Sequence, residues 1–373
     1  STHWSNILSG YQFRPFSFEE RLLTQSRLLL IYLKWTILPS TSQLGLFHDD
    51  IPLSSSLLMP WSTLPSIAAH IVLAPIASFL LYKRAPWIGF SIAWFYGGHL
   101  MESTVIPLEM VFEHRNYLPS FGIIFGAVLL VMTAINRAKT LNPQIIKVAF
   151  FMPAVFLAFI SFLKCLEWSD ERTLLISMVT NHPNSPRAHY EVGRLFLKNY
   201  HPSETPEHYE SARDHFQQAI QLNPDYVGGY TGQLLLFDAS KNTVDTGFLS
   251  KMTNALSSGH LKYSTHSFIS GVSECQISKH CQFAPGIIDQ IYQATFSNPS
   301  IMPRLKAQLL HSYSRYLYYS EQRLNDALLA LMEGKSLQPK DIEIDLMIIR
   351  VLITQNRLET AASAVELLKV HPR

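Results

Sequence analysis

The chain has 373 residues, of which 47% are hydrophobic and only 16% are charged, and its formal net charge is +2. Soluble proteins usually carry about 25% charged residues, so this low fraction favours a protein with membrane-embedded parts. The nearly neutral balance offers no basic surface for nucleic acid, and the sequence has no zinc-type cysteine spacing, glycine-rich phosphate loop or nucleophile elbow.

The N-terminal region combines aromatic residues with a partly polar helix. The aromatic residues between Tyr11 and Phe16 suit a membrane interface, where Arg14 could meet a lipid phosphate. The apolar stretch 19–38 predicts a helix that lies at the membrane interface, and a fifth membrane span is the alternative. Four of its side chains would be costly at the bilayer centre: Arg21, Gln25, Arg27 and Lys34. Because the sequence begins without Met and without a signal-peptide pattern, we expect the C-terminal part of a longer membrane protein.

Four later stretches are each about as long as the 20 apolar residues that a membrane-spanning helix needs. These stretches cover 62–82, 87–106, 118–135 and 146–164. The turn with Lys83 and Arg84 and the connection with Arg137, Lys139 and Lys147 are basic, whereas 39–61 and 107–117 have no positive excess. Because basic loops remain in the cytoplasm, we predict that 39–61, 107–117 and everything after 165 lie on the opposite side.

Two groups of polar residues stand out in these segments, one in the predicted outer segment 39–61 and one in the predicted span 87–106. His48, Asp49 and Asp50 could hold a divalent cation or supply a base, although a turn with solvated acids is the alternative. His99 and Glu102 are three residues apart and share a helix face, and ionisable residues inside a span usually face the protein interior or a wet cavity. A structural polar pair is the alternative for these two.

The densest polar string lies between two predicted spans, at the outer membrane boundary. It consists of Glu113, His114, Arg115, Asn116 and Tyr117. A guanidinium at this boundary could pair bidentately with a phosphate, and Glu113 could orient either His114 or Arg115. A charged cap where a helix meets the headgroups is the alternative.

After residue 165 the sequence contains a degenerate helical-repeat pattern. Ala212, Phe216, Ala219 and Pro224 form one ladder, preceded by Gly193 and Phe196 on another helix. Similar ladders recur as Ala327, Leu331, Gly334 and Pro339, and as Ala361, Val365 and Leu368, while 226–300 fits poorly. This pattern predicts tetratricopeptide repeats, whose stacked hairpins build a solenoid that binds a peptide or protein; a generic helical array is the alternative.

The three cysteines have different surroundings in the sequence. Cys165 ends an apolar run, whereas Cys275 and Cys281 lie in a polar segment with five residues between them. If that segment is extracytoplasmic, a disulfide between Cys275 and Cys281 is plausible, and two reduced thiols are the alternative.

The stretch from Gly98 to Gly122 resembles bacterial polytopic membrane proteins with C-terminal tetratricopeptide repeats. It is also similar to the animal transmembrane and tetratricopeptide-repeat-containing O-mannosyltransferases, whose pattern fits Glu113, Tyr117, Pro119, Ser120 and Gly122. His114 stands where that family often has arginine, with Arg115 displaced by one position. The resemblance implies a type-C glycosyltransferase fold, a polyprenyl-phosphate sugar donor and a catalytic acid in an earlier outer loop that this chain lacks.

These observations predict an all-α protein with two domains. Residues 1–165 would form a membrane domain with about four transmembrane helices plus the helix over 19–38, and 166–373 would form the repeat solenoid. The resemblance places the protein in the bacterial inner membrane with its repeats in the periplasm, where lipid, a lipid-linked sugar and a peptide would be its partners. We recognise no metal site or other cofactor.

The predicted function is transfer of a sugar from a polyprenyl-phosphate carrier to an acceptor, which could be a protein. Arg115 and His114 would contact the donor phosphate, and the repeats would position the acceptor. A non-enzymatic membrane-anchored scaffold is one alternative, and a ligase or polymerase of surface polysaccharide is another.

Overall fold

The computed structural model describes residues 10–83, 85–137 and 142–370, and within these it contains α-helices and short 3-10 helices but no strands. The all-α prediction is therefore confirmed for this part of the chain. The start of the sequence and two of the basic residues used to orient it, Arg84 and Lys139, lie outside the described residues.

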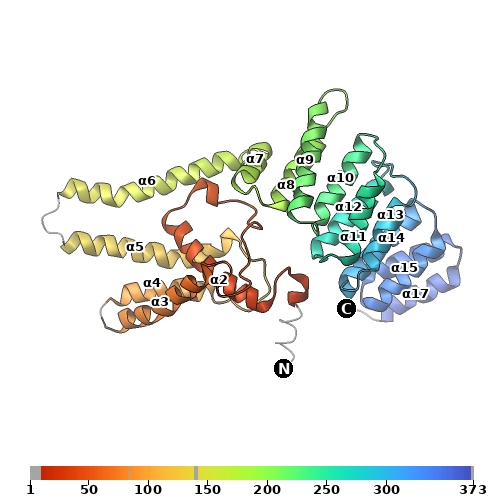
Figure 1. The fold of residues 1–373 in the computed structure, drawn as a ribbon. Coiled ribbons are helices and arrows are strands. Elements are labelled where there is room, and N and C mark those ends of the chain that lie inside the picture. The colour runs from red at the N-terminus through yellow and green to blue at the C-terminus, as the bar shows by residue number, and fades with distance from the viewer. Residues whose placement is uncertain (1–9, 84, 138–141, 371–373) are drawn as a thin grey trace. The chain divides into compact units, whose positions relative to one another are not determined.

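The chain forms two compact units, Ser1–Ala188 and His189–Arg373 (Figure 1). We expected the boundary at residue 165, but the segment 166–188 groups with the first unit. The physical reason is that helix α7 (Glu171–Asn181) packs on the loop 44–50, where the backbone N–H of Leu46 lies 3.2 Å from the sulfur of Met178.

The first unit is built from a packed group of helices in which α3 lies against α4, α4 against α5, and α2 against both α3 and α5. Its helices are α2 (Phe18–Ile37), α3 (Thr63–Lys83), α4 (Pro86–His99), α5 (Tyr117–Arg137), α6 (Pro143–Trp168) and α7, with 3-10 turns at Gly10–Phe13, Thr41–Gln43 and Glu113–Asn116. His70 of α3 joins this group, with one ring nitrogen 2.7 Å from the hydroxyl of Tyr96 and the other 2.7 Å from the carbonyl of Ser26.

The close approach of α4 and α5 requires glycine at two positions one helical turn apart. A Cβ atom on Gly122 would lie 2.6 Å from the carbonyl oxygen of Ser91, and one on Gly126 would lie 2.8 Å from the Ser91 hydroxyl. Small residues spaced by four let helix backbones meet in this way, which is a common device where lipid surrounds the helices.

Two helices in the described part of the chain are long and apolar enough to cross a membrane. They run over Glu113–Arg137 and Phe151–Trp168 and correspond to the predicted spans 118–135 and 146–164. The apolar side chains of the second, among them Phe151, Val155 and Phe159, are largely exposed, as expected for a surface that faces lipid. Within α3 the apolar stretch Thr63–Ala77 is shorter than these two.

The predicted span over 87–106 is not a single helix. α4 ends at His99, so its 14 residues extend about 21 Å, short of the roughly 30 Å hydrocarbon core of a bilayer. The chain then continues irregularly from 100 to 112, because its carbonyl groups bond to side chains of α2 in place of a helical ladder.

Helix α2 begins with a capping box formed by Ser17 and Glu20, and it buries its polar side against the protein. The guanidinium of Arg21 is completely buried and donates to the carbonyl oxygens of Glu102, Thr104 and Leu108 at 2.6, 3.0 and 2.7 Å. One turn later, the amide of Gln25 donates to the carbonyl of Met110 at 2.9 Å. The donors of Arg21 and Gln25, two of the side chains that made this helix costly in a bilayer, thus find acceptors within the protein, whereas Lys34 is exposed.

The same helix also holds the segment that precedes α3. Arg27 donates to the hydroxyl of Ser62 at 2.9 Å and to the carbonyl of Pro52 at 2.8 Å. The hydroxyl of Thr24 accepts from the buried backbone N–H of Ser54 at 2.8 Å. Two irregular segments that are far apart in the sequence, 52–62 and 100–112, are therefore fixed on one helix.

The second unit is an array of helices in which each helix packs on the next one or on the next but one (Figure 1). In the described part its helices are α8 (Pro186–Lys198, which starts in the first unit), α9 (Pro206–Leu222), α10 (Val227–Ala239), α11 (Thr246–Ser258), α12 (Tyr263–Ile277), α13 (Ile287–Phe296), α14 (Pro303–Tyr319), α15 (Leu324–Leu337), α16 (Ile342–Thr354) and α17 (Leu358–Val370). The region 226–300, which fitted the repeat pattern poorly, is helical as well.

The predicted ladders form the buried faces of these helices. Ala212, Phe216 and Ala219 of α9 are completely buried, and so are Ala327 and Leu331 of α15. The ring of Phe216 lies between α8 and α10, where a Cβ atom on Gly193 or Gly232 would come within 2.6 or 2.3 Å of it. The spacing of small and large residues therefore predicted the buried faces of α9 and α15 correctly, whereas in α17 Ala361 is buried and Val365 only half-buried.

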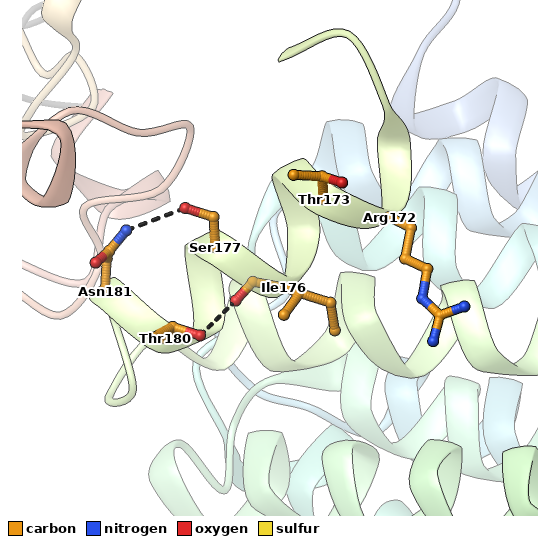
Figure 2. Close-up of a pocket in the computed structure, with 6 residues that line it drawn as sticks. All are labelled: Arg172, Thr173, Ile176, Ser177, Thr180 and Asn181. Carbon is orange, nitrogen blue, oxygen red and sulfur yellow. Dashed lines mark hydrogen bonds between the residues drawn. The ribbon is translucent and has the colours of Figure 1, made fainter. Parts of the chain in front are cut away.

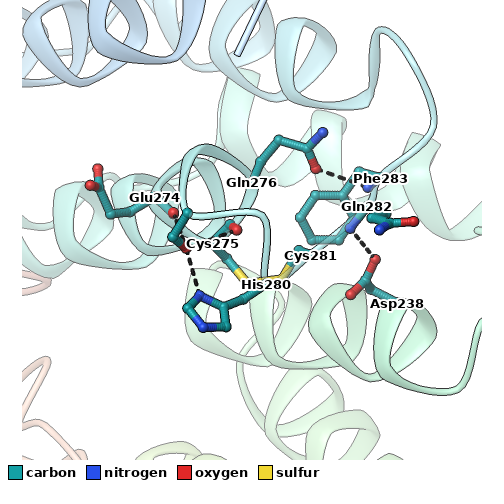
Figure 3. Close-up of a disulfide and its surroundings, with 9 residues drawn as sticks. Asp238, Glu274, Cys275, Gln276, His280, Cys281, Gln282 and Phe283 are labelled. Atoms are coloured by element: carbon teal, nitrogen blue, oxygen red, sulfur yellow. Dashed lines mark hydrogen bonds between the residues drawn. A yellow bond between two sulfur atoms is a disulfide. The ribbon is translucent and has the colours of Figure 1, made fainter. Parts of the chain in front are cut away.

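Cys275 and Cys281 are joined by a disulfide at the end of α12 (Figure 3). The loop after it is held by two backbone N–H groups, of which that of Gln282 donates to Asp238 at 2.7 Å and that of Phe283 donates to the Gln276 side chain at 2.9 Å. Cys165 is a free, exposed cysteine.

Replacement of Arg21 by Met is expected to lower the free energy of unfolding by about 3 kcal/mol or more, because three carbonyl groups would lose their donor inside the protein. Thermal unfolding in detergent and protease cleavage within 100–112 measure this change. Lys34→Met is the matched control, since Lys34 is an exposed basic residue of the same helix. Equal stability of the two variants would contradict the role given to Arg21.

Thiol counting tests the disulfide. Protein purified without reductant and denatured in SDS is expected to react with a maleimide at Cys165 alone, whereas reduced protein should react at all three cysteines. Mass spectrometry of the labelled peptides distinguishes the two results. Labelling of Cys275 and Cys281 without reduction would show that this loop is not cross-linked in the cell.

Candidate functional site

The polar string occupies a short turn at the start of the first membrane-length helix. Glu113–Asn116 forms a 3-10 turn, Phe112 before it is extended, and Tyr117 is the first residue of α5. Pro119 follows in the first turn of α5, where a missing N–H costs no helical hydrogen bond. Because successive residues of a tight turn point in different directions, the five side chains have different environments.

Glu113 contacts the loop 44–50 and not its neighbours in the string. Its carboxylate accepts hydrogen bonds from the backbone N–H of Gly45 and from Nε2 of His48, the latter at 3.0 Å. The His48 side chain is only 3% exposed, and its ring packs on Trp35 with 5.1 Å between ring centroids. We expected Glu113 to orient His114 or Arg115, but its hydrogen-bond partners Gly45 and His48 lie in the first predicted outer segment.

Asp49 and Asp50 join the same loop to the end of α7. A carboxylate oxygen of Asp50 lies 3.0 Å from Nδ1 of His182, and Asp49 accepts from the hydroxyl of Ser185 at 2.5 Å and from the backbone N–H of Arg187 at 3.3 Å. Burial alone would raise the pKa of the Asp50 carboxyl, but the hydrogen bond and the charge of His182 outweigh it and hold that pKa below its usual value. The side chains of all three residues 48–50 therefore have protein partners, although Asp49 is also exposed to solvent.

His48 and His182 lie against each other, with 5.1 Å between their ring centroids. Each ring has one nitrogen beside a carboxylate, and the other nitrogen, Nδ1 of His48 or Nε2 of His182, is buried without a hydrogen-bond partner among the described residues. Only in the neutral rings, with each carboxylate accepting an N–H, do the two unpaired nitrogens carry lone pairs. A ligand or water reaches them only when the loop 44–50 moves, because both nitrogens are out of contact with solvent.

Arg115 is held by the irregular segment 100–112. Its Nε lies 3.2 Å from a carboxylate oxygen of Glu102, its Nη1 donates to the carbonyl of Glu109 at 2.6 Å, and its guanidinium stands 4.7 Å from the centroid of the Phe112 ring. The side chain is 10% exposed. Glu102 is thus paired with Arg115, and an incoming phosphate would have to replace this carboxylate.

His99 is buried and connects to the polar string through Asn116. Its ring is stacked on Tyr32 with 5.1 Å between centroids, and Nε2 lies 3.3 Å from Oδ1 of Asn116. The amide of Asn116 also donates to the hydroxyl of Thr36 at 2.9 Å. His99 and Glu102, predicted to share a helix face, have separate partners because α4 ends between them.

Two members of the string remain open. His114 is exposed, with its ring tilted against that of Phe112 at 5.1 Å, and Tyr117 is 86% exposed. These two side chains stand beside Arg115 in the sequence and offer a donor and a hydroxyl to a ligand at the end of α5.

The aromatic and basic residues before α2 also contact the irregular segment. The hydroxyl of Tyr11 donates to the carbonyl of Val105 at 2.9 Å, and Arg14 donates to the carbonyl of Pro107 at 2.7 Å and pairs with Glu109 at 3.3 Å. Arg14, which we expected to meet a lipid phosphate, is therefore engaged by protein groups.

Sequence reasoning missed two residues of this site, His182 and Ser185. They lie more than 130 residues from their partners Asp50 and Asp49, so no local spacing could associate them. The sequence did offer a chemical signal. His182 and Ser185 stand close together just before a helix, and both side chains can bond to an acidic pair such as Asp49 and Asp50.

The shape and composition of the described surface add little to this picture. A hollow of about 510 Å³ runs along α7 between Arg172 and Asn181, but it includes none of the predicted site residues (Figure 2). Its polar groups bond within the helix, with Asn181 donating to Ser177 at 3.1 Å and Thr180 to the carbonyl of Ile176 at 2.8 Å. Among the described residues no three His, Cys, Asp or Glu side chains lie close enough to hold a metal ion.

Comparison with known proteins adds no family assignment. No family model matches the sequence, and no curated protein matches it.

The contact between Asp50 and His182 predicts an acid-sensitive site. A carboxyl whose pKa is lowered by folding stabilises the folded state above its unfolded pKa of about 3.9, and this contribution is lost as the pH falls through the folded pKa. The thermal midpoint should therefore fall more steeply below about pH 4 in the wild type than in Asp50→Asn. Glu359→Gln, at an exposed residue of α17, is the control and should follow the wild type. Parallel curves for all three proteins would contradict the assignment.

Proposed function

We propose that this chain is part of an integral-membrane glycosyltransferase that takes a sugar from a polyprenyl-phosphate carrier on the extracytoplasmic side. In this proposal α5 and α6 cross the membrane, α3 and α4 complete the membrane domain, and the helical unit from His189 onward is a solenoid of degenerate tetratricopeptide repeats. The likeness of 98–122 to the O-mannosyltransferase family supports the choice of reaction, and a protein hydroxyl is the acceptor that this likeness favours.

The observation that carries the proposal is the convergence of ionisable side chains at one end of a membrane-length helix. His48, Glu102 and Arg115 come from three separate segments and meet around the turn that starts α5. A plain membrane anchor needs no such cluster, and ionisable groups beside a membrane helix usually serve a substrate or ion.

Within this site the exposed residues and the residue already paired with protein groups have different roles in the proposal. The open side chains of His114 and Tyr117 would make the first contacts with the donor phosphate. Arg115 would then exchange Glu102 for a phosphate oxygen, since the two anions compete for one guanidinium. Placed there, the cation stabilises the negative charge that grows on the departing polyprenyl phosphate.

The disulfide supports the extracytoplasmic side for the helical unit. Disulfides persist in oxidising compartments such as the bacterial periplasm and are rare in the cytosol. This agrees with the orientation derived from the basic turns, which depends on a different physical effect, the charge bias of loops.

A non-enzymatic scaffold is the second candidate. One observation favours it: Glu113, Arg115 and Asn116 already have protein partners, as they would in a structural junction between a membrane helix and its outer loops. In that case α5 and α6 would anchor the chain, and its activity would lie entirely in the helical unit.

Transfer assays with the full-length protein in nanodiscs distinguish the two candidates. With labelled polyprenyl-phosphate mannose as donor, and the glucose form tested in parallel, Arg115→Ala is expected to lower kcat about 100-fold, since one lost donor to a developing anion has that effect. His114→Ala should raise KM with a smaller effect on kcat, because it removes an initial contact.

Arg137→Ala, at the opposite end of α5, is the matched control and should transfer at the wild-type rate. Thermal midpoints of each variant separate loss of chemistry from loss of folding. Wild-type rates for both site variants would exclude this turn as the donor site, and absence of transfer by the wild-type protein with either donor would favour the scaffold.

A further inference from the structure

A turn directly before α3 carries four large apolar side chains that are exposed. They belong to Leu57, Leu58, Met59 and Trp61, and Trp61 is 79% exposed. Single exposed apolar residues are normal on any protein, but four within five positions form a contiguous patch, and such patches mark contact sites for proteins, ligands or membranes. We call the segment 55–61 the apolar turn.

The apolar turn has a defined conformation that keeps these side chains outside the core of the first unit. The carbonyl oxygen of Met59 accepts from the backbone N–H groups of Ser55 and Ser56 at 3.0 and 3.3 Å, and the Ser56 hydroxyl accepts from the N–H of Met59 at 3.1 Å. The bonds of Arg27 described above hold the chain before and after the turn. The exposure is therefore a property of a fixed turn and not of a chain that is free to fold back onto the core.

The apolar turn lies at the same end of the helix group as the start of α5. Only two residues separate Lys83, at the end of α3, from Pro86, at the start of α4, so these packed helices are antiparallel. A Cβ atom on Gly98, near the end of α4, would lie 2.8 Å from the ring of Pro119 in the first turn of α5. The beginnings of α3 and α5 therefore lie at one end of the group, where α5 carries the exposed side chain of Tyr117.

Exposed aromatic side chains mark this end of the helix group. Trp61 and Tyr117 are joined there by Trp168, the last residue of α6, which is 54% exposed. α6 reaches the same end because Lys164 donates to the carbonyl of Leu44, in the segment that bonds to the polar string. Trp and Tyr concentrate where a bilayer meets water, since their rings are apolar while their N–H or O–H groups need polar partners. Their common position is the one expected at a membrane–water boundary.

The composition of the surrounding surface favours lipid over a protein partner. Between Asp50 and Lys83 the sequence has no Asp, Glu, Lys or Arg, whereas protein interfaces have a polar rim. The exposed apolar face continues along α3 through Leu64 and Ile71, which are seven residues apart and share a side of the helix. Helices α4 and α5 meet through small residues such as Gly122, whereas the apolar turn presents large side chains, which suit contact with acyl chains.

We propose that the apolar turn inserts into the bilayer leaflet that meets the start of α5. Trp61 lies at the level of the lipid headgroups, and the three aliphatic side chains before it contact the acyl chains. The segment 39–61, predicted as an outer loop, thus has its tip in lipid. Because α2 holds both the apolar turn and the segment 100–112, this insertion also fixes the depth of the segment that positions Arg115.

The inference rests on the membrane crossing of α5 and α6 in the proposed function and not on the sugar transfer. A probe on α6 therefore accompanies the probe on the turn. Failure of the crossing and failure of the insertion then give different results.

The experiment attaches an environment-sensitive NBD fluorophore to single cysteines of the full-length protein in phosphatidylcholine–phosphatidylglycerol nanodiscs. Cys165→Ser removes the free thiol, and labelling without reductant leaves the disulfide closed. Leu58→Cys places the probe on the turn. Leu329→Cys in α15 is the matched control, because Leu329 is 65% exposed and Leu58 is 66% exposed. Phe159→Cys, on the exposed apolar surface of α6, reports the crossing.

The probe of Leu58→Cys is expected to emit at shorter wavelength than that of Leu329→Cys, to be quenched by nitroxide-labelled lipid and to be protected from iodide. Leu329→Cys should show the opposite pattern, although the two leucines are equally exposed in the structure. Met59→Cys should behave as Leu58→Cys does, which excludes a local effect of one substitution.

Two results at the turn would overturn the proposal. Quenching of the Leu58→Cys probe by iodide would place the turn in water, and protection from both quenchers would show that protein covers it. If the Phe159→Cys probe also escapes the lipid nitroxide, α6 does not cross the membrane, and the membrane arrangement of the proposed function fails together with the insertion.

Discussion

One buried guanidinium organises the first unit. Arg21 has no exposed surface, and it directs its donors at three carbonyl groups within a single irregular segment, those of Glu102, Thr104 and Leu108. Neither the guanidinium nor the three carbonyl groups could be buried without the other, since an unpaired buried charge and unpaired buried carbonyls each cost free energy. Together they allow non-helical backbone beside helices of membrane-spanning length, and within a bilayer such backbone is tolerated only where protein covers it. The proposed site depends on this arrangement, because the same segment supplies Glu102 and the carbonyl of Glu109 to Arg115.

The sequence predicted those features of the fold that depend on local pattern. Apolar runs located α3, α5 and α6, and the ladder of Ala212, Phe216 and Ala219 identified a buried helix face. The run 87–106 was misread because hydropathy measures transfer of side chains and does not register where backbone groups find partners. From Leu100 onward those partners are side chains of α2, about 80 residues earlier in the chain.

The candidate site was predictable as a set of residues but not as a set of contacts. The string 113–117 and the loop 48–50 were recognised by their density of polar groups, and the structure brings them together through His48 and Glu113. Their pairing with His182 could not be derived, because it joins the loop 44–50 to the end of a helix that follows both membrane-length helices. Spacing rules act over a few residues, whereas this contact depends on the path of the whole first unit.

Polar groups without partners help to distinguish functional sites from purely structural ones in this protein. In the first unit Nδ1 of His48 and Nε2 of His182 are buried in a packed junction, where a ligand can bond to them only when the loop 44–50 moves. In the second unit Gln233 and Tyr230 border an open hollow, and their polar atoms are not among the buried ones that lack a partner. The energetic penalty of a buried group without a partner therefore applies to the two histidine nitrogens and not to the side chains of this hollow. The junction between the loop 44–50 and α7 thus fits a site that must open before it acts.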